Sequence, residues 1–158
     1  MKQINLPSFE NPLGFQIVKT HQEHFFLDQN LFHGEYKRFY SNGNLLSHGF
    51  YDQGQLDGLF LSYDESGHLI SKIPYENGVI NGSKEIFYPD GNLYYQGQIK
   101  NGLKQGLHLA YFLNRNIMSE IHYLDDQLHG ESRLYFADGK IKRRFFAEHG
   151  QIVKEFAE

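Results

Sequence analysis

Hydrophobic, polar and glycine positions recur along this chain with a period of 24 residues. The clearest column is glycine, which keeps this spacing without a slip at Gly34, Gly58, Gly82, Gly106 and Gly130. Positions within a repeat are counted here from that glycine, so position 5 lies five residues after it. A period of this length is typical of a tandem repeat array.

Three further columns keep the same register. Position 5 is always aromatic: Phe39, Tyr63, Phe87, Tyr111 and Tyr135. Position 11 is a branched aliphatic residue: Leu45, Leu69, Leu93, Ile117 and Ile141. Position 17 is mostly tyrosine, and the column weakens at its end: Tyr51, Tyr75, Ile99, Tyr123 and Ala147.

Each repeat divides into two predicted strands separated by a tight turn. In the first repeat they are Glu35–Tyr40 and Leu45–Tyr51, with Asn42-Gly43 between them. Asn-Gly and Asp-Gly between apolar runs are strong hairpin signals, because glycine accepts the positive φ that such turns need. The fourth repeat has Asn114-Arg115-Asn116 instead. We expect the turn to persist there, because asparagine tolerates the left-handed region.

Alternation along the second strand predicts its two faces. Positions 11, 13, 15 and 17 share an apolar, aromatic side, whereas the positions between them are mixed, as at His48, Lys72 and Glu120. The sequence therefore predicts an all-β fold, a single elongated and curved antiparallel meander sheet built of tandem 24-residue β-hairpin repeats. Stacked hairpins of this kind stabilise one another across their boundaries.

The repeats also predict the division of the chain. Residues 1–32 form an irregular lead-in and a degenerate capping hairpin, for which we expect strands at Phe15–Lys19 and His24–Asp28. A loosely ordered arm is the alternative for this segment. Residues 33–158 hold five tandem hairpin repeats and a short C-terminal strand.

The repeat motifs resemble the variant form of the MORN repeat. The resemblance rests on Gly34 to Leu45, Gly49 to Gly58 and Gly82 to Gly106, and it extends over about Phe25 to Ile152. It implies a long curved sheet with one hairpin per repeat and a role as a binding or scaffolding module. The variant form also occurs in bacterial proteins similar to the antitoxin, or immunity, component of toxin systems.

Composition narrows the classes of function. The net charge is −4, which gives no basic field for nucleic acid or anionic membrane. Cysteine is absent, which excludes disulfides and thiolate chemistry. The N-terminus has no apolar run typical of a signal peptide, and no stretch approaches a membrane span, so we expect a cytoplasmic protein.

Candidate catalytic and metal-ligating residues are scattered. The nine histidines show no ligand spacing, although His21 and His24 could converge in a hairpin. His33 and His129 occupy a column that accepts other polar residues, and Asp125 and Asp126 fit a turn. No nucleophile elbow or phosphate-binding glycine motif occurs. We therefore expect no enzyme activity, no cofactor and no metal site.

One basic cluster runs from Lys140 to Arg144, and on a strand Lys140, Lys142 and Arg144 share a face. It fits a charged edge strand that resists further β-pairing. The alternative is a contact for an acidic partner or a lipid headgroup.

Protein binding is the function that these patterns favour. We expect the partner to be a protein, and the family resemblance implies one that is toxin- or effector-like. We do not expect binding to nucleic acid or to a membrane. A membrane-associated scaffold, a secreted effector, and a carbohydrate or lipid binder remain alternatives, the last weakened by the absence of Trp. Self-association through the sheet edges also stays open. We expect the partner in a concave groove lined by both aromatic columns: Phe39, Tyr51, Tyr63, Tyr75, Phe87, Tyr111, Tyr123 and Tyr135.

Overall fold

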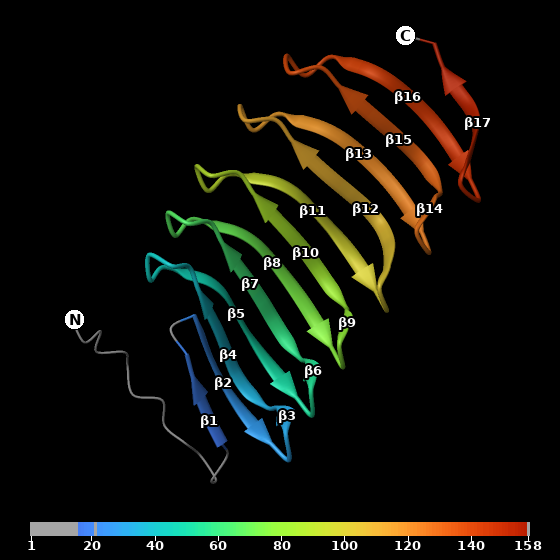
Figure 1. The fold of residues 1–158 in the computed structure, drawn as a ribbon. Helices are drawn as coiled ribbons and strands as arrows, with labels where there is room; N and C mark the ends of the chain where they lie inside the picture. Colours follow the sequence, from blue (N-terminus) through green and yellow to red (C-terminus); the bar gives the residue numbers. More distant parts are fainter. Residues whose placement is uncertain (1–15, 21, 158) are drawn as a thin grey trace.

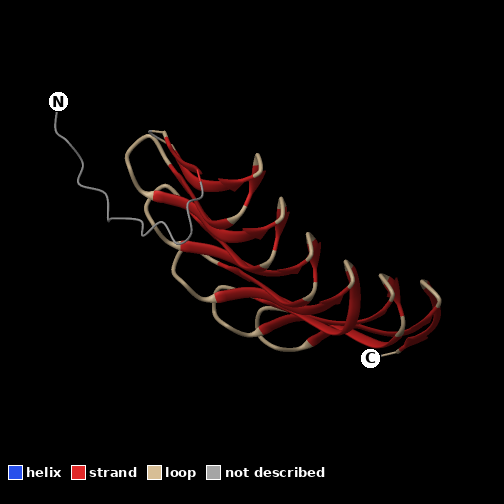
Figure 2. Cartoon of the chain, turned by 90° about the horizontal axis from the view of Figure 1, so that it is seen from below, coloured by secondary structure: helices blue, strands red, loops and turns tan. Residues whose placement is uncertain are grey.

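The computed structural model describes residues 16–20 and 22–157. In this part of the chain, seventeen strands form a single sheet, and there is no helix (Figure 1). The sheet is elongated and curved, and it is one layer thick (Figure 2). The predicted fold class is therefore confirmed. The lead-in through residue 15 and His21 lie outside the described residues.

The first strands are β1 (Gln16–Lys19), β2 (Glu23–Asp28), β3 (Leu31–Phe32), β4 (Gly34–Phe39), β5 (Leu45–Asp52), β6 (Gln55–Leu56), β7 (Gly58–Tyr63), β8 (Leu69–Glu76) and β9 (Val79–Ile80). The others are β10 (Gly82–Phe87), β11 (Leu93–Lys100), β12 (Leu103–Tyr111), β13 (Ile117–Leu124), β14 (Gln127–Leu128), β15 (Gly130–Tyr135), β16 (Ile141–Glu148) and β17 (Gln151–Phe156).

Antiparallel pairing follows the chain order. The short strands β3, β6, β9 and β14 each pair with the same neighbour as the strand after them, so each doublet forms one interrupted strand. In the fourth repeat β12 runs through without this break. The residue at each break keeps its backbone hydrogen bond, as where Asp57 donates its N–H to Phe50 O at 2.9 Å.

A β-bulge interrupts each of the five repeat hairpins at the same place. The pairing shifts by one residue just before position 5, for example between Arg38 and Phe39 and between Leu134 and Tyr135. A bulge bends its strand and increases the local twist. The repeat glycines also have positive φ, as at Gly82 with 126°, where a Cβ atom would lie 2.8 Å from Pro74 Cγ.

The turn of the fourth repeat keeps its shape without glycine, as expected. The positive φ falls on Arg115 (68°), which occupies the column of Gly43, Gly67, Gly91 and Gly139, rather than on an asparagine. The following inter-repeat turn places Asp125 and Asp126 in the same region, at 51° and 65°.

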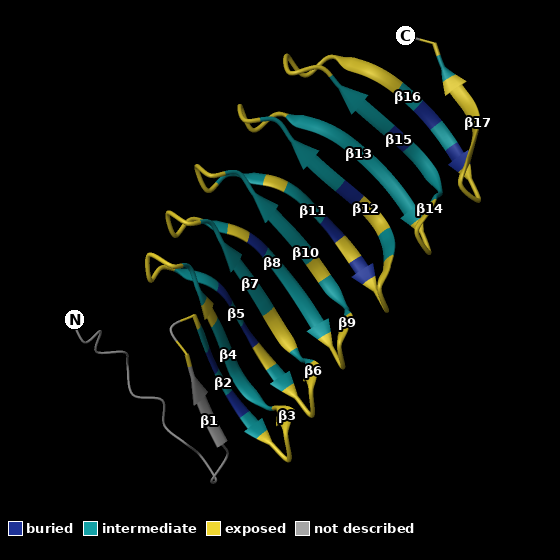
Figure 3. Ribbon diagram, in the orientation of Figure 1, coloured by how far each residue is buried: buried dark blue, intermediate teal, exposed yellow. Residues whose placement is uncertain are grey.

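No second layer covers the described sheet, so burial comes from neighbouring strands. The apolar side chains that are buried among the described residues are Phe26, Ile99, Phe145 and Ala147, and the turns are exposed (Figure 3). Large aromatic side chains are therefore mostly half-buried. Burying one of them fully would stabilise the fold by roughly 1.5–3 kcal/mol, so each here contributes part of that range.

The ends of the sheet differ from its middle. β1 and β2 form a hairpin close to the ranges expected for a cap, although the division at residues 32 and 33 stays a prediction. At the other end, Lys154 stands in the repeat-glycine column and has no positive φ. There, Ala147 pairs with Ile152 and Phe146 with Lys154, a shift of one residue. At the other repeat junctions the shift is two, as where Tyr123 pairs with Leu128 but Glu120 pairs with Arg133.

Candidate functional site: two faces of one sheet

Cross-strand pairing defines two faces, because directly paired residues share a side. One face, called here the charged face, carries a continuous row of paired residues: His48, Leu61, Lys72, Glu85, Gln96, Leu109, Glu120, Arg133 and Arg144. The other, called here the serine face, carries a row of mostly small residues: Ser47, Ser62, Ser71, Ile86, Tyr95, Ala110 and Ser119.

The two predicted aromatic columns lie on opposite faces. Position 5 follows the charged face, as shown by the Tyr111 hydroxyl, which accepts a hydrogen bond from Gln96 Nε2 at 3.2 Å. Position 17 follows the serine face, where the ring of Tyr123 lies 4.9 Å from that of His108. The expectation that both columns line one groove is wrong. The bulge before position 5 shifts the register by one residue, and such a shift moves a side chain to the other face.

Four of the five rings of the position-5 column, those of Phe39, Phe87, Tyr111 and Tyr135, contact a polar side chain of a neighbouring strand. Lys72 Nζ lies 5.2 Å from the centre of the Phe87 ring. The Tyr135 hydroxyl donates to Glu120 Oε2 at 2.8 Å, and burial together with this hydrogen bond raises its pKa. The rings of Phe39 and His24 lie 5.0 Å apart. These contacts fix the rings in place before any partner arrives.

Apolar residues at position 12 flank this column on the same face: Leu46, Ile70, Tyr94 and Met118. Ile70 and Tyr94 are 40% and 38% exposed. A shallow pocket lies between the second and third repeats, lined by Ile70, Phe87 and Tyr88 among others. Position 12 was not among the site residues predicted from the sequence, although its apolar residues recur in four repeats and were a usable signal.

Charged side chains in the middle of this face form ion pairs, most of them across strands. Arg144 binds Glu131 through two hydrogen bonds of 3.0 and 2.8 Å, and Arg133 reaches Glu120 Oε2 at 3.2 Å. The hydrogen bonds from Arg144 hold the pKa of Glu131 below its usual range. In the first repeat Glu35 contacts both Lys37 Nζ (2.6 Å) and His48 Nε2 (2.8 Å). Exposed pairs of this kind stabilise little, but they balance the local charge.

On the serine face, the position-17 tyrosines pack into ring clusters. Tyr51 lies 5.5 Å from Tyr36 and 5.1 Å from Phe32, and Tyr75 lies 6.2 Å from Phe60. Burial raises the pKa of Tyr51. These tyrosines therefore pack mainly against the ring at position 2 of their own repeat, and Tyr51 also contacts Phe32 of the preceding element.

His108 is the most enclosed polar ring of the serine face, at 3% exposure. Its Nε2 donates to the backbone oxygen of Gln98 at 3.0 Å, and its Nδ1 accepts from the Tyr95 hydroxyl. Both ring nitrogens are satisfied in the neutral form that carries its proton on Nε2. Burial lowers the pKa of His108.

The part of the chain that the structure describes holds neither a cluster of metal ligands nor a membrane-spanning helix. Over the described residues, no group of three His, Cys, Asp or Glu side chains converges as metal ligands would. Asp125 and Asp126 lie in a turn, where Asp126 Oδ1 accepts the N–H of Lys104 at 2.8 Å. In the same part of the chain no helix is long and apolar enough to cross a membrane.

Comparison with known families places these features in context. The sequence profile of the MORN repeat variant matches residues 32–53, 56–77, 80–101 and 128–146. The chain belongs to the MORN repeat variant family. MORN repeats are generally protein- or membrane-binding modules. The matched ranges pass over most of the fourth repeat, whose turns lack glycine, yet β12 and β13 form the same MORN hairpin there.

Other comparisons add little to the MORN assignment. Curated proteins gave no match. Among solved structures, a GtfA/B complex bound to UDP and GlcNAc is similar at 13% sequence identity with a TM-score of 0.28. The alignment covers 88% of this chain and 25% of that one, so the chain spans a quarter of its length.

Proposed function

We propose that this chain is a non-enzymatic protein-binding module whose partner lies along the position-5 column of the charged face. The observation that supports this proposal is an uncovered row of half-exposed rings, Phe39, Tyr63, Phe87, Tyr111 and Tyr135, flanked by exposed Ile70 and Tyr94. Rigid aromatic side chains supply contact area at low entropic cost, which favours binding to a protein surface.

Charge favours a protein over a lipid surface as the partner. The arginines and lysines in the middle of the charged face are paired with carboxylates, as Lys72 is with Glu85 at 3.5 Å. Attraction to an anionic membrane depends on unpaired basic residues, each contributing about 1 kcal/mol. A membrane-associated scaffold is therefore the second candidate, and a secreted effector built on the same repeats is a third.

The narrower form of the proposal is an antitoxin or immunity-type protein, or an adaptor, that acts in the cytoplasm by covering a toxin- or effector-like protein. The family resemblance motivates this form. It requires one stoichiometric partner whose activity falls on binding. Cell fractionation tests the location, and an activity assay of the captured partner tests the inhibition.

A matched pair of variants tests the surface. Ile70→Asp places a charge on the charged face, whereas Val79→Asp places the same charge at the inter-repeat edge, where Val79 is 45% exposed. We expect affinity capture with the wild-type chain and with Val79→Asp to recover one stoichiometric protein that Ile70→Asp loses. Equal recovery by both variants, or binding to anionic vesicles in place of a protein, would contradict the proposal.

A further inference from the structure

Side-chain hydrogen bonds join most of the adjacent hairpin turns. The Tyr40 hydroxyl, at position 6 of the first repeat, donates to the backbone oxygen of Tyr63 in the second repeat at 2.8 Å. Tyr88, at position 6 of the third repeat, donates to Tyr111 O of the fourth repeat at the same distance. The fourth repeat uses two asparagine amides, at positions 8 and 10, which donate to position 7 of the fifth repeat at 2.9 Å each. A tyrosine at position 6 therefore reaches across to the following repeat.

The second repeat departs from this arrangement. Its position 6 is Asp64, the one residue of that column that is not aromatic. The Asp64 carboxylate turns back into its own turn, where Oδ1 accepts the backbone N–H groups of Ser66 and His68 at 2.9 Å each. In the other repeats an Asn or Asp at position 8 accepts the N–H of position 10, but Ser66 does not. Among the described residues, no hydrogen bond joins the turn of the second repeat to that of the third.

A pocket of about 240 Å³ opens at this junction. It is lined by Asp64, His68, Leu69 and Ile70 of the second repeat and by Phe87, Tyr88 and Pro89 of the third. Phe87 is the counterpart of Tyr63, so the pocket lies where the Tyr40 side chain crosses the first junction. The backbone oxygen of Phe87 accepts no hydrogen bond from a described side chain, unlike that of Tyr63. Pockets for whole small-molecule ligands measure about 300–1,000 Å³, so this one suits a single side chain.

The two turns beside this pocket are acidic. They hold the carboxylates of Asp64, Glu65 and Asp90 and no lysine or arginine. The backbone N–H of His68 holds the pKa of Asp64 below its usual range, so this carboxylate is charged at neutral pH. Arg115 of the fourth repeat balances part of the charge of Asp90. The surroundings of the pocket therefore favour an occupant with basic neighbours.

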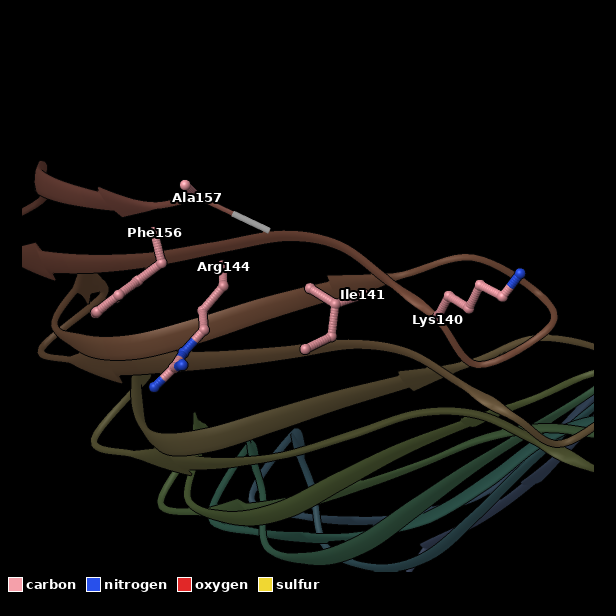
Figure 4. Close-up of a pocket in the computed structure, with 5 residues that line it drawn as sticks. All are labelled: Lys140, Ile141, Arg144, Phe156 and Ala157. Carbon is pink, nitrogen blue, oxygen red and sulfur yellow. The ribbon is translucent and has the colours of Figure 1, made fainter.

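Another pocket of the sheet has the opposite charge. It lies at the last strand pair, and its lining includes Lys140 and Arg144 beside Ile141 and Phe156 (Figure 4). A segment with basic residues is attracted to the pocket at Asp64 and repelled by this one. The second pocket therefore serves as an internal control for the first.

We propose that the pocket between the second and third repeats binds a tyrosine side chain of the protein partner, carried on a segment with basic residues beside it. The ring occupies the place that Tyr40 takes at the first junction, and its hydroxyl donates to Phe87 O. The neighbouring basic side chains face the carboxylates of Asp64 and Glu65. This proposal rests on the proposed function, because the tyrosine belongs to the partner that covers the charged face.

A double variant tests whether the pocket is a vacant tyrosine site. Asp64→Tyr/Ser66→Asn copies positions 6 and 8 of the first repeat, so that the chain supplies its own ring and its own turn cap. We expect the melting temperature to rise by about 2–4 °C, because one hydrogen bond and one packed ring are gained. Phe112→Tyr is the matched control, since it adds a tyrosine hydroxyl at position 6 of the fourth repeat and leaves the pocket open.

Binding is measured with a synthetic Lys-Tyr-Lys peptide, blocked at both ends and followed by the amide NMR shifts of the full chain. Amides from Asp64 to Ile70 and of Phe87 and Tyr88 should shift, and those from Lys140 to Arg144 should not. A Lys-Phe-Lys peptide should bind about two- to tenfold more weakly, because it lacks the hydroxyl. The shifts should disappear in Asp64→Tyr/Ser66→Asn and persist in Phe112→Tyr.

Four results would overturn the proposal. Unchanged binding to the double variant would place the peptide elsewhere, and equal binding of Lys-Phe-Lys would remove the hydroxyl contact. Equal binding of a Glu-Tyr-Glu peptide would remove the charge argument. No shifts at millimolar peptide would show that the pocket is only a gap in packing.

The capture experiment with Ile70→Asp separates this proposal from the proposed function. If Ile70→Asp loses a protein that Val79→Asp retains while the peptide does not bind, only the tyrosine pocket is wrong. If the peptide binds but both variants recover the same protein, the pocket accepts tyrosine and the partner lies elsewhere, which contradicts the proposed function.

Discussion

The imidazole of His108 lies directly over Gly97 on the serine face, so that a Cβ atom on this glycine would collide with the ring. Gly97 has no positive φ, so its role is to make room rather than to permit a special backbone conformation. Phe60 covers Gly49 in the same way two repeats earlier. A ring laid over a glycine is how this one-layer sheet encloses side chains without a second layer.

Gly97→Ala should therefore destabilise the fold although alanine suits an extended backbone. Overpacking of this kind costs about 1–3 kcal/mol, because the ring must leave its hydrogen bonds to Gln98 and Tyr95. Urea denaturation measures the free energy of unfolding. Gly106→Ala is the control for added volume, since its Cβ would meet no atom within 4 Å, although its φ of 68° adds its own strain. A Gly97→Ala protein as stable as wild type would show that the ring moves freely.

Acid should destabilise the protein through His108. Burial lowers its pKa in the folded state, so the unfolded chain, with a pKa of about 6.5, binds the proton first as pH falls. The contribution of His108 is complete above pH 6.5 and is lost below it, with a slope of at most about 1.4 kcal/mol per pH unit.

The matched variant is His108→Phe, because Phe60 over Gly49 shows that a plain ring fits this position. The difference between the unfolding free energies of wild type and variant should shrink as pH falls from 7 to 5. Taking this difference removes the contributions of the other histidines, because both proteins contain them. A difference independent of pH would mean that His108 titrates alike in both states.

Arg115→Gly should stabilise the protein. Arg115 holds a φ of 68° in a column where the other repeats have glycine. An L-residue in the left-handed region destabilises the folded state by about 1–2 kcal/mol. Glycine relieves this strain, but its greater conformational freedom in the unfolded chain offsets part of the relief, so we expect the free energy of unfolding to rise by about 0.5–1 kcal/mol. Thermal melting measures it. Arg115→Ala retains the strain and should give no gain, so equal melting temperatures for the two variants would contradict this account.

Removing single tyrosine hydroxyl groups should show which face of the sheet binds the partner. Tyr111→Phe, on the charged face, should weaken binding of the captured partner by about 0.5–1.5 kcal/mol, the usual net contribution of a hydrogen bond. Tyr75→Phe, on the serine face, should leave binding unchanged. Isothermal titration calorimetry measures both. The proposal for the charged face fails if Tyr75→Phe weakens binding and Tyr111→Phe does not.

The repeat columns of the sequence were sufficient to predict the fold. Five glycines in register and the Asn-Gly or Asp-Gly turns predict hairpins in a meander, and the pairing of β4 to β16 follows that order. Local turn chemistry determined these elements, and local chemistry is what a sequence displays most directly.

The sides of the strands were harder to predict. The bulge before position 5 puts Phe39 and Tyr51 on opposite faces, and no residue type marks it, because the shift lies in the backbone register. Phe156 faces the charged side through a similar shift at Lys154. The sequence also did not indicate that His108 is buried, because its column, position 2, holds residues of different kinds: Tyr36, Phe60, Lys84 and Ser132.

The bulge recurs at the same column in the five repeat hairpins, so each repeat adds the same increment of bend. The radius of the arc is then a property of one 24-residue unit, and its length a property of how many units are joined. When a repeat is gained or lost, the sheet therefore extends further or less far around a bound object. The curvature of the object that it fits stays the same.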